Sequence, residues 1–339
     1  MKFPIPSETS MRSVEKSLYQ NNLNIIKDYL SNGLASKPSI SYLVCCDILE
    51  SFPNNIYVKN KICGVISSFN LNPNNFILLI TDAASYMVLG GEKLKYEKFI
   101  LENNVEIAFK NLFHVTCVVH LYHNMSAKIA SYYKNANNLV ISMNLALSKS
   151  KARNKLFKNI PLHPTFCKTR FGDWLKVIEY FSKYYLYIKN IVDAFETDGA
   201  IVSKVKVAVN HLNLCRELVD IMHNYYFLYT LIKQSCSVKY TISDAIDDLN
   251  NLNFKRNHAS IKLYVEKRLI NSDIKGIEHL IREDITPSQY AKLLMCQATS
   301  ISVERRFSIL HTINAKERNF KAENLAEYVL LKYNLGNKI

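Results

Sequence analysis

The sequence has no cysteine pair at the C-x-x-C spacing and no apolar run long enough to cross a membrane. None of its eight cysteines forms a C-x-x-C pair, so no cysteine-based zinc module is expected. No apolar run approaches the roughly 18 residues that a bilayer-spanning helix needs. The N-terminus also lacks the charged start and hydrophobic segment of a secretory signal. These absences predict reduced, buried thiols and an intracellular protein with no membrane partner.

Glycine and proline are scarce as well, with 8 of each in 339 residues, and no internal repeat or low-complexity segment is present. Because nearly half of the residues are apolar, the composition is that of a globular protein and excludes a disordered or fibrous one. The length allows two domains, or one large domain that carries an insertion.

Acidic residues are in short supply. The chain has 43 Lys and Arg against 29 Asp and Glu, a formal net charge of +14. A basic surplus of this size suggests a polyanionic partner, and nucleic acid is favoured over a membrane because no basic amphipathic helix with an aromatic face is present. Alternatively, the surplus serves solubility.

Apolar runs and helical periods alternate in the first part of the chain, which predicts a mixed α/β fold. Strands are expected at residues 40–49, 76–80 and 111–117. Helices are expected at residues 10–30 and 58–69, after residue 82, and through about residue 133. From there to about residue 285 the pattern is almost wholly helical, with stripes at 139–147, 174–195, 200–233 and 242–252 that we interpret as core. The tail from residue 287, including 324–333, is again helical.

The run Phe76–Ile80 leads directly to Asp82. A carboxylate at the carboxyl end of a buried strand lies where ligands and catalytic groups collect in open α/β sheets, so Asp82 is a natural metal ligand. The alternative is that Asp82 only accepts backbone N–H bonds at the start of the next helix.

Four motifs occur in order along the chain. They are Thr81-Asp-Ala-Ala84, Cys117-Val-Val-His120, Thr169-Arg-Phe-Gly-Asp-Trp174 and Thr299-Ser-Ile-Ser-Val-Glu-Arg-Arg-Phe-Ser-Ile-Leu310. Together they resemble the T-D-x-A, C-x-x-H, T-R-W-x-x-W and S-x-x-E-R-x-F-S motifs of the hAT superfamily of transposases. Each motif is weak alone, and four in register are specific. Phe171 stands where the family usually has Trp.

The resemblance implies an RNase H-like core, a mixed sheet with flanking helices, interrupted by a large all-helical insertion, so that the chain is mostly helical overall. The expected organisation has four parts. These are an N-terminal helical segment at 1–33, the first part of the core at 34–135, the helical insertion at 136–286, and a C-terminal dimerisation segment at 287–339 that completes the core.

By motif match, Asp82 and Glu304 are the second and third catalytic acids and ligands of Mg²⁺ or Mn²⁺. This chemistry uses three carboxylates to hold two metal ions roughly 3.5–4 Å apart. Without the family match, Glu304 reads as an acidic residue in the first turn of a helix, where the helix dipole favours it.

The resemblance also implies DNA contacts, for Cys117, His120, Arg170, Trp174 and Arg305. Cys117 and His120, with His114 and His123 at the same spacing, invite a zinc interpretation, but side chains that straddle a strand end and a helix start cannot all face one ion, so no structural zinc is expected. Trp174 lies on an apolar stripe and is alternatively core. The basic run Lys149, Lys151, Arg153, Lys155 and Lys158 suits phosphates, or alternatively is a solvated face.

The family's first strand, which carries the first catalytic Asp, has no counterpart before residue 40, and Asp47 is a poor substitute. We therefore expect a truncated or degenerate hAT-type protein that binds DNA, forms homodimers or larger homo-oligomers, and is catalytically impaired. The alternatives are a domesticated non-catalytic DNA-binding and dimerisation protein, or a residual metal-dependent nuclease. The expected location is the nucleus in a eukaryote.

Overall fold

The structure, a computed structural model, describes residues 51–100, 106, 107, 109, 111–164, 166, 172–196, 199–237, 239–252, 259–269, 272–275, 277 and 287–300, and isolated positions 24, 45, 49, 326, 327, 329 and 330. The chain divides into two compact units. The sheet unit comprises Met1–Cys117, Val238–Ile246 and Asn271–Ile339. The helical unit comprises Val118–Ser237 and Asp247–Ile270. The fold is a mixed, helix-rich one with a small parallel sheet.

The sheet unit is built around two parallel strands. β1 (Leu78–Thr81) pairs with β4 (Phe113–Thr116), so that Leu78 lies opposite Phe113 and Thr81 opposite Thr116. Both strands were predicted from their apolar runs. All four β4 residues are buried, whereas Leu78, Leu79 and Ile80 of β1 are only partly buried. β4 is therefore well covered, whereas β1 is more exposed.

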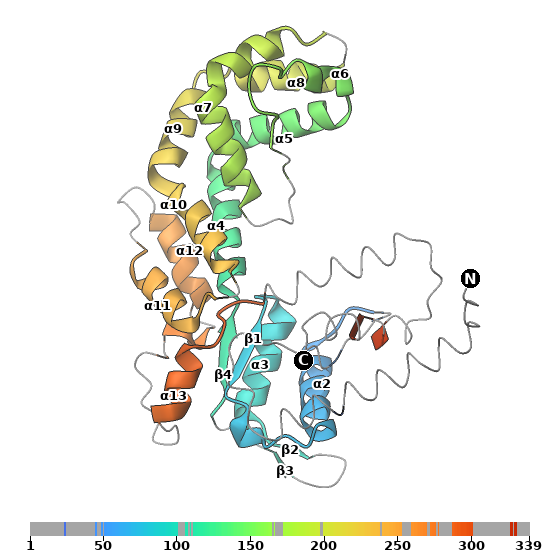
Figure 1. Cartoon of the computed structure of the whole chain (residues 1–339), viewed down its shortest axis with the longest axis vertical. Coiled ribbons are helices and arrows are strands. Elements are labelled where there is room, and N and C mark those ends of the chain that lie inside the picture. The colour runs from blue at the N-terminus through green and yellow to red at the C-terminus, as the bar shows by residue number, and fades with distance from the viewer. Residues whose placement is uncertain are drawn as a thin grey trace, which may run out of the picture. The chain divides into compact units, whose positions relative to one another are not determined.

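Helices cover this pair of strands (Figure 1). The further elements of the unit are α2 (Asn55–Ser68), η1 (Pro73–Asn75), α3 (Ser85–Tyr96), η3 (Asp273–Lys275), α13 (Pro287–Leu294) and the antiparallel pair β2 (Phe99–Ile100) and β3 (Glu106–Ile107). α3 contacts both strands, and α2 packs against α3.

The core of the sheet unit is an apolar cluster whose fully enclosed members include Leu94, Phe109 and Leu112, with Phe76 and Leu79 packed against it. The Phe76 and Phe109 rings meet edge to face, with centroids 5.5 Å apart. Since each buried Leu or Phe side chain stabilises the fold by about 1.5–3 kcal/mol, this cluster fixes α3 and the strands against each other.

Every described element of the helical unit is a helix. They are α4 (Val118–Tyr132), α5 (Lys134–Ser148), α6 (Lys151–Lys155), α7 (Asp173–Asp193), α8 (Ala200–Val209), α9 (Leu214–Tyr225), α10 (Phe227–Ser235) and α12 (Ala259–Leu269). The boundary between the units falls within α11 (Ile242–Asn250). Within this unit, α6 and α8 lie at one end and α10 and α12 at the other (Figure 1).

The predicted core stripe of α7 is confirmed, because Val177, Ile178, Phe181 and Val192 are buried. The helix is kinked at Tyr184, where φ is −112° and ψ is 20°. The single stripe predicted over 200–233 is in fact three helices. The chain leaves the α-helical region at Asn210, the C-cap of α8. Tyr226, which separates α9 from α10, keeps α-helical dihedrals, with φ of −62° and ψ of −25°, although the two helices are distinct.

Two other predictions need correction. The strand predicted at 40–49 is not seen at Cys45 or Leu49, the two positions that the structure describes there. Cys215 is exposed rather than buried, because α9 turns Leu214, Leu218 and Ile221 inward and leaves Cys215 on its outer side.

The predicted helix at 10–30 lies outside the described residues except at Asn24, which is helical. The C-terminal helix predicted at 324–333 is helical at its four described positions.

Candidate functional site

Asp82 lies immediately after β1, at the carboxyl edge of the parallel pair, and is half-buried. Its Oδ1 accepts the backbone N–H of Ala84 at 3.1 Å, two residues along the chain. This is an Asx-type turn that leads the chain from β1 into α3. The described residues form no other hydrogen bond to this carboxylate, so part of its acceptor capacity remains for a ligand.

The end of β1 is held by a buried hydroxyl–imidazole contact. Thr81 Oγ1 donates to the backbone carbonyl of Asp82 at 2.9 Å and lies 2.8 Å from Nε2 of His114 on β4. Because the hydroxyl has one proton, this arrangement requires His114 Nε2 to carry its own proton and donate it to Thr81. Burial lowers the pKa of His114 to about 4, against an opposing effect of Asp273, so the ring is neutral at pH 7.

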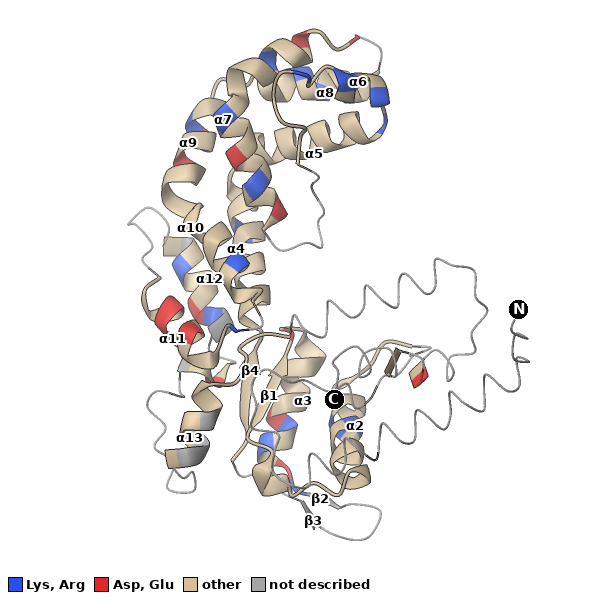
Figure 2. Ribbon diagram, in the orientation of Figure 1, with Lys and Arg blue, Asp and Glu red and all other residues tan. Residues whose placement is uncertain are grey.

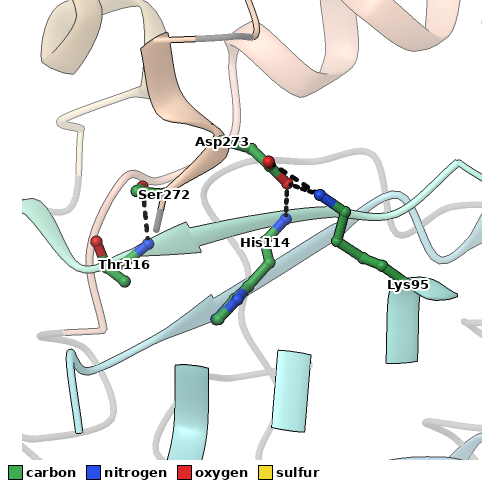
Figure 3. A network of polar contacts seen from close by, with 5 residues as sticks. All are labelled: Lys95, His114, Thr116, Ser272 and Asp273. Carbon is green, nitrogen blue, oxygen red and sulfur yellow. Dashed lines mark hydrogen bonds and ion pairs between the residues drawn. The ribbon is translucent and has the colours of Figure 1, made fainter. Parts of the chain in front are cut away.

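The edge of β4 that faces away from β1 is closed by side chains instead of another strand (Figure 3). Asp273 Oδ2 accepts the backbone N–H of His114 at 2.7 Å, and Ser272 Oγ accepts that of Thr116 at 3.2 Å. Lys95 of α3 donates to both carboxylate oxygens of Asp273, at 2.9 and 2.8 Å. The His114 ring points away from this ion pair.

The sequence alone did not single out Lys95, Ser272 or Asp273. Ser272 and Asp273 bond to strand residues that precede them by 156 and 159 positions. No local pattern signals such a contact, because an isolated serine or aspartate is ordinary in a loop.

Cys117 brings the C-terminal part of the chain to the same edge as Asp82. Its backbone N–H donates to the carbonyl of Thr81 at 2.7 Å, and its Sγ accepts the backbone N–H of Ser300 at 3.3 Å. Residues 296–298 are fixed by bonds from Ile242 N to Cys296 O and from Ala298 N to Tyr240 O. The first residues of the motif Thr299–Leu310 therefore lie beside the first residue of Cys117–His120.

The other predicted site residues fall into two groups. Trp174 and His120 belong to the helical unit, where Trp174 is only 6% exposed and His120, on α4, is half-buried. Trp174 therefore packs in the interior of its unit, as its place on the apolar stripe indicates. Glu304, Arg305 and Arg170 lie outside the described residues.

A two-metal centre needs several carboxylates around one point. Among the residues that the structure describes, no three His, Cys, Asp or Glu side chains gather closely enough to hold a metal ion. At the carboxyl edge of the sheet, Asp82 supplies one carboxylate directly after β1. The described residues by themselves do not fit the metal pair that the resemblance implies, and no reaction step is derived through it.

The chain matches no known family model, and no curated protein matches it. The resemblance to hAT transposases thus stays a prediction that rests on the four motifs and their order. None of the helices in the described part of the chain is both long and apolar enough to cross a membrane.

Proposed function

We propose that this chain is a hAT-type, transposase-like protein that binds DNA and self-associates but does not cleave DNA efficiently. The observation that best supports the proposal is the contact between Ser300 and Cys117 at the edge that carries Asp82. Glu304 follows Ser300 by four residues, a separation that spans at most about 14 Å. Two segments that the motifs single out are thus within reach of each other although they are far apart in sequence.

The chain path also favours an RNase H-like core with an insertion. The sheet unit ends its first segment at Cys117, directly after β4, and resumes at Val238 and again at Asn271. Between these points the chain forms the helical unit. An inserted helical domain between the strand edge and the segment with Glu304 is the organisation that the resemblance implies.

Purified protein incubated with supercoiled DNA and Mg²⁺ or Mn²⁺ is expected to leave the DNA intact, because no counterpart of the first catalytic Asp exists in the sequence. An Asp82→Ala variant should then be indistinguishable from the natural chain. Cleavage that both Asp82→Ala and Glu304→Ala abolish would show a working metal site and favour the residual nuclease. Retained DNA binding without cleavage fits both the impaired transposase and the domesticated binding protein.

DNA binding is proposed on the distribution of charge. The helical unit contains 21 Lys and Arg against 10 Asp and Glu, whereas the rest of the chain contains 22 against 19. Most of the net charge of +14 therefore belongs to the helical unit. Since phosphate neutralisation needs no base-reading element, we expect binding with little sequence preference.

Self-association through the C-terminal segment is the remaining part of the proposal. The chain should scatter light as a dimer at micromolar concentration, and removal of residues 301–339 should produce a monomer. The deletion begins after Ser300 because residues 296–298 bond to residues 240–242 and are part of the sheet unit. Val329 and Leu330 are already buried within the chain, so a partner would contact other residues of the segment.

A thermal unfolding curve of the shortened chain serves as the control for folding. If the shortened chain is unfolded, the full chain with Leu325→Glu and Leu331→Glu gives the same test, because both leucines are apolar residues of the helix predicted at 324–333. A full-length monomer at tens of micromolar, or a dimer that survives both changes, would refute this part of the proposal.

A further inference from the structure

A long stretch of the chain contains no acidic residue. Between Glu106 and Asp173 lie 66 residues with ten Lys and Arg and no Asp or Glu. This stretch includes α4, α5 and α6 of the helical unit. Because ordinary soluble surfaces mix both signs of charge, an acid-free stretch of this length points to a function for the positive charge.

The most basic part of this stretch is the turn from α5 into α6, residues 149–158, which we call the basic turn. It is fastened to the end of α5 by hydrogen bonds. Arg153 Nη1 donates to the carbonyl of Ala146 at 3.0 Å, and Asn154 Nδ2 donates to that of Leu147 at 3.1 Å. Both carbonyls belong to the last turn of α5, and that of Leu147 also accepts the backbone N–H groups of Lys149 and Ser150. Ser150 Oγ caps α6 by accepting the N–H of Arg153.

Apolar packing holds the basic turn as well. Phe157 and Ile160 are buried, and the Arg153 guanidinium lies 5.8 Å from the centroid of the Phe195 ring. The carbonyl of Phe195 accepts a hydrogen bond from Lys206 Nζ at 3.0 Å. Arg153 is therefore a structural anchor, and the backbone of the basic turn has a defined path.

Four lysines of the basic turn are left pointing into solvent. Lys149, Lys151, Lys155 and Lys158 are all exposed, and no residue that the structure describes forms an ion pair with any of them. In Figure 2 the blue of Lys and Arg gathers on and around α6. Lys151 and Lys155 lie four residues apart within α6, so these two side chains share one side of that helix.

From this arrangement we infer that the basic turn is the surface on which the helical unit binds the phosphate backbone of duplex DNA. The inference rests on the proposed function and adds the place of contact. Lysines act as flexible point charges toward phosphates, and a fixed backbone beneath them reduces the ordering that binding requires. Arg153 and Asn154, the side chains of the turn best suited to reading bases, are bonded to carbonyls of α5, so the turn contributes affinity without sequence preference.

The test compares two variants of equal charge. In one, the four turn lysines are changed to Gln. In the matched control, four other exposed lysines of the helical unit, on α7, α10 and α12, are changed to Gln: Lys176, Lys233, Lys262 and Lys267. Lys176 lies near the start of α7, whereas Phe195, which contacts Arg153 of the basic turn, follows the end of that helix. Exposed Lys-to-Gln changes alter stability little, which thermal unfolding would verify.

Affinity for a 30-base-pair duplex is measured across a salt series. Since each phosphate contact contributes about 0.9 to the slope of log K against log salt, the turn variant should lose about 2 to 4 from that slope and bind at least ~10-fold more weakly. The control should lose less than about 1 from the slope. Equal losses in the two variants would overturn the assignment and leave only a general effect of net charge.

If DNA binding itself is wrong, the experiment gives a different result from the one that would overturn the basic turn as the binding surface. If the natural chain itself binds the duplex no more tightly than a neutral protein does, DNA binding is wrong, and the variants are not needed to show it. Competition with duplex RNA of the same length tests the class of partner. Displacement of the DNA by an equal or smaller amount of RNA would overturn the choice of DNA, whereas weaker competition by RNA supports it.

Discussion

Replacing Gly91 with alanine should destabilise the sheet unit by about 2–3 kcal/mol, because α3 contacts the strands through a glycine. A β-carbon at Gly91 would lie 2.2 Å from Nδ1, 2.5 Å from Cε1 and 2.6 Å from Cγ of His114. The His114 ring cannot turn aside easily, since it is buried and its Nε2 bonds to Thr81. Either α3 or the end of β1 must then move.

Gly64 provides a matched control in α2. A β-carbon at Gly64 meets nothing within 4 Å, so Gly64→Ala should stabilise the chain by about 0.5–1 kcal/mol through helix propensity. Urea unfolding of both variants gives the comparison. Adding His114→Ser to Gly91→Ala should recover part of the loss, because it removes the ring that clashes. Equal effects of the two glycine substitutions would show that close packing at Gly91 does not matter.

Acid should unfold this protein, and His163→Phe should remove much of that sensitivity in the helical unit. His163 is buried against Tyr180 and Phe181, with ring centroids 5.6 and 5.3 Å away. Burial lowers its pKa from 6.5 to about 4. In the unfolded chain His163 is therefore protonated below about pH 6.5, whereas in the folded chain it is protonated only below about pH 4.

The stability due to neutral His163 is thus fully present above pH 6.5 and is lost as the pH falls toward 4. A shift of this size corresponds to about 3 kcal/mol. Phenylalanine keeps the aromatic packing and does not titrate, so the variant should retain about 3 kcal/mol more of its pH 7 stability at pH 4. Urea unfolding at several pH values measures this difference.

His114 lies in the sheet unit and keeps its own acid dependence, so the His163 variant should still weaken somewhat at low pH. A His211→Gln variant, at an exposed position, is the control for the removal of a histidine from the same unit. Parallel curves for His163→Phe and the natural chain would refute the role of His163.

The parts of the fold that the sequence predicted are those with strong local patterns. β1 and β4 follow from short apolar runs, and α7 from its period of buried residues. The breaks inside 200–233 were missed because the apolar period continues across Asn210 and Tyr226, so periodicity alone did not mark the turns. β2 and β3, with two residues each, are too short to leave a pattern.

At Cys45 and Leu49, the two described positions of the strand predicted at 40–49, the backbone is not in a strand. Residues favoured in strands adopt that conformation only when a neighbouring strand supplies hydrogen bonds and packing, which a sequence window does not reveal. At the candidate site the sequence pointed to Asp82 and Cys117 through their motifs. It gave no sign of the polar contacts at Ser272 and Asp273, because these join residues from distant parts of the chain.

The side chains that close the outer edge of β4 limit where this small sheet can accept another strand. Ser272 and Asp273 already occupy the N–H groups of Thr116 and His114, and Lys95 neutralises the aspartate, so an incoming strand would have to break an ion pair to bind there. β1, whose first three residues are only partly covered, has no such barrier on the side away from β4 within the described residues. Within the described part of the chain, the outer side of β1, the strand that ends at Asp82, is therefore the edge left open for a further strand from the same chain or from another copy.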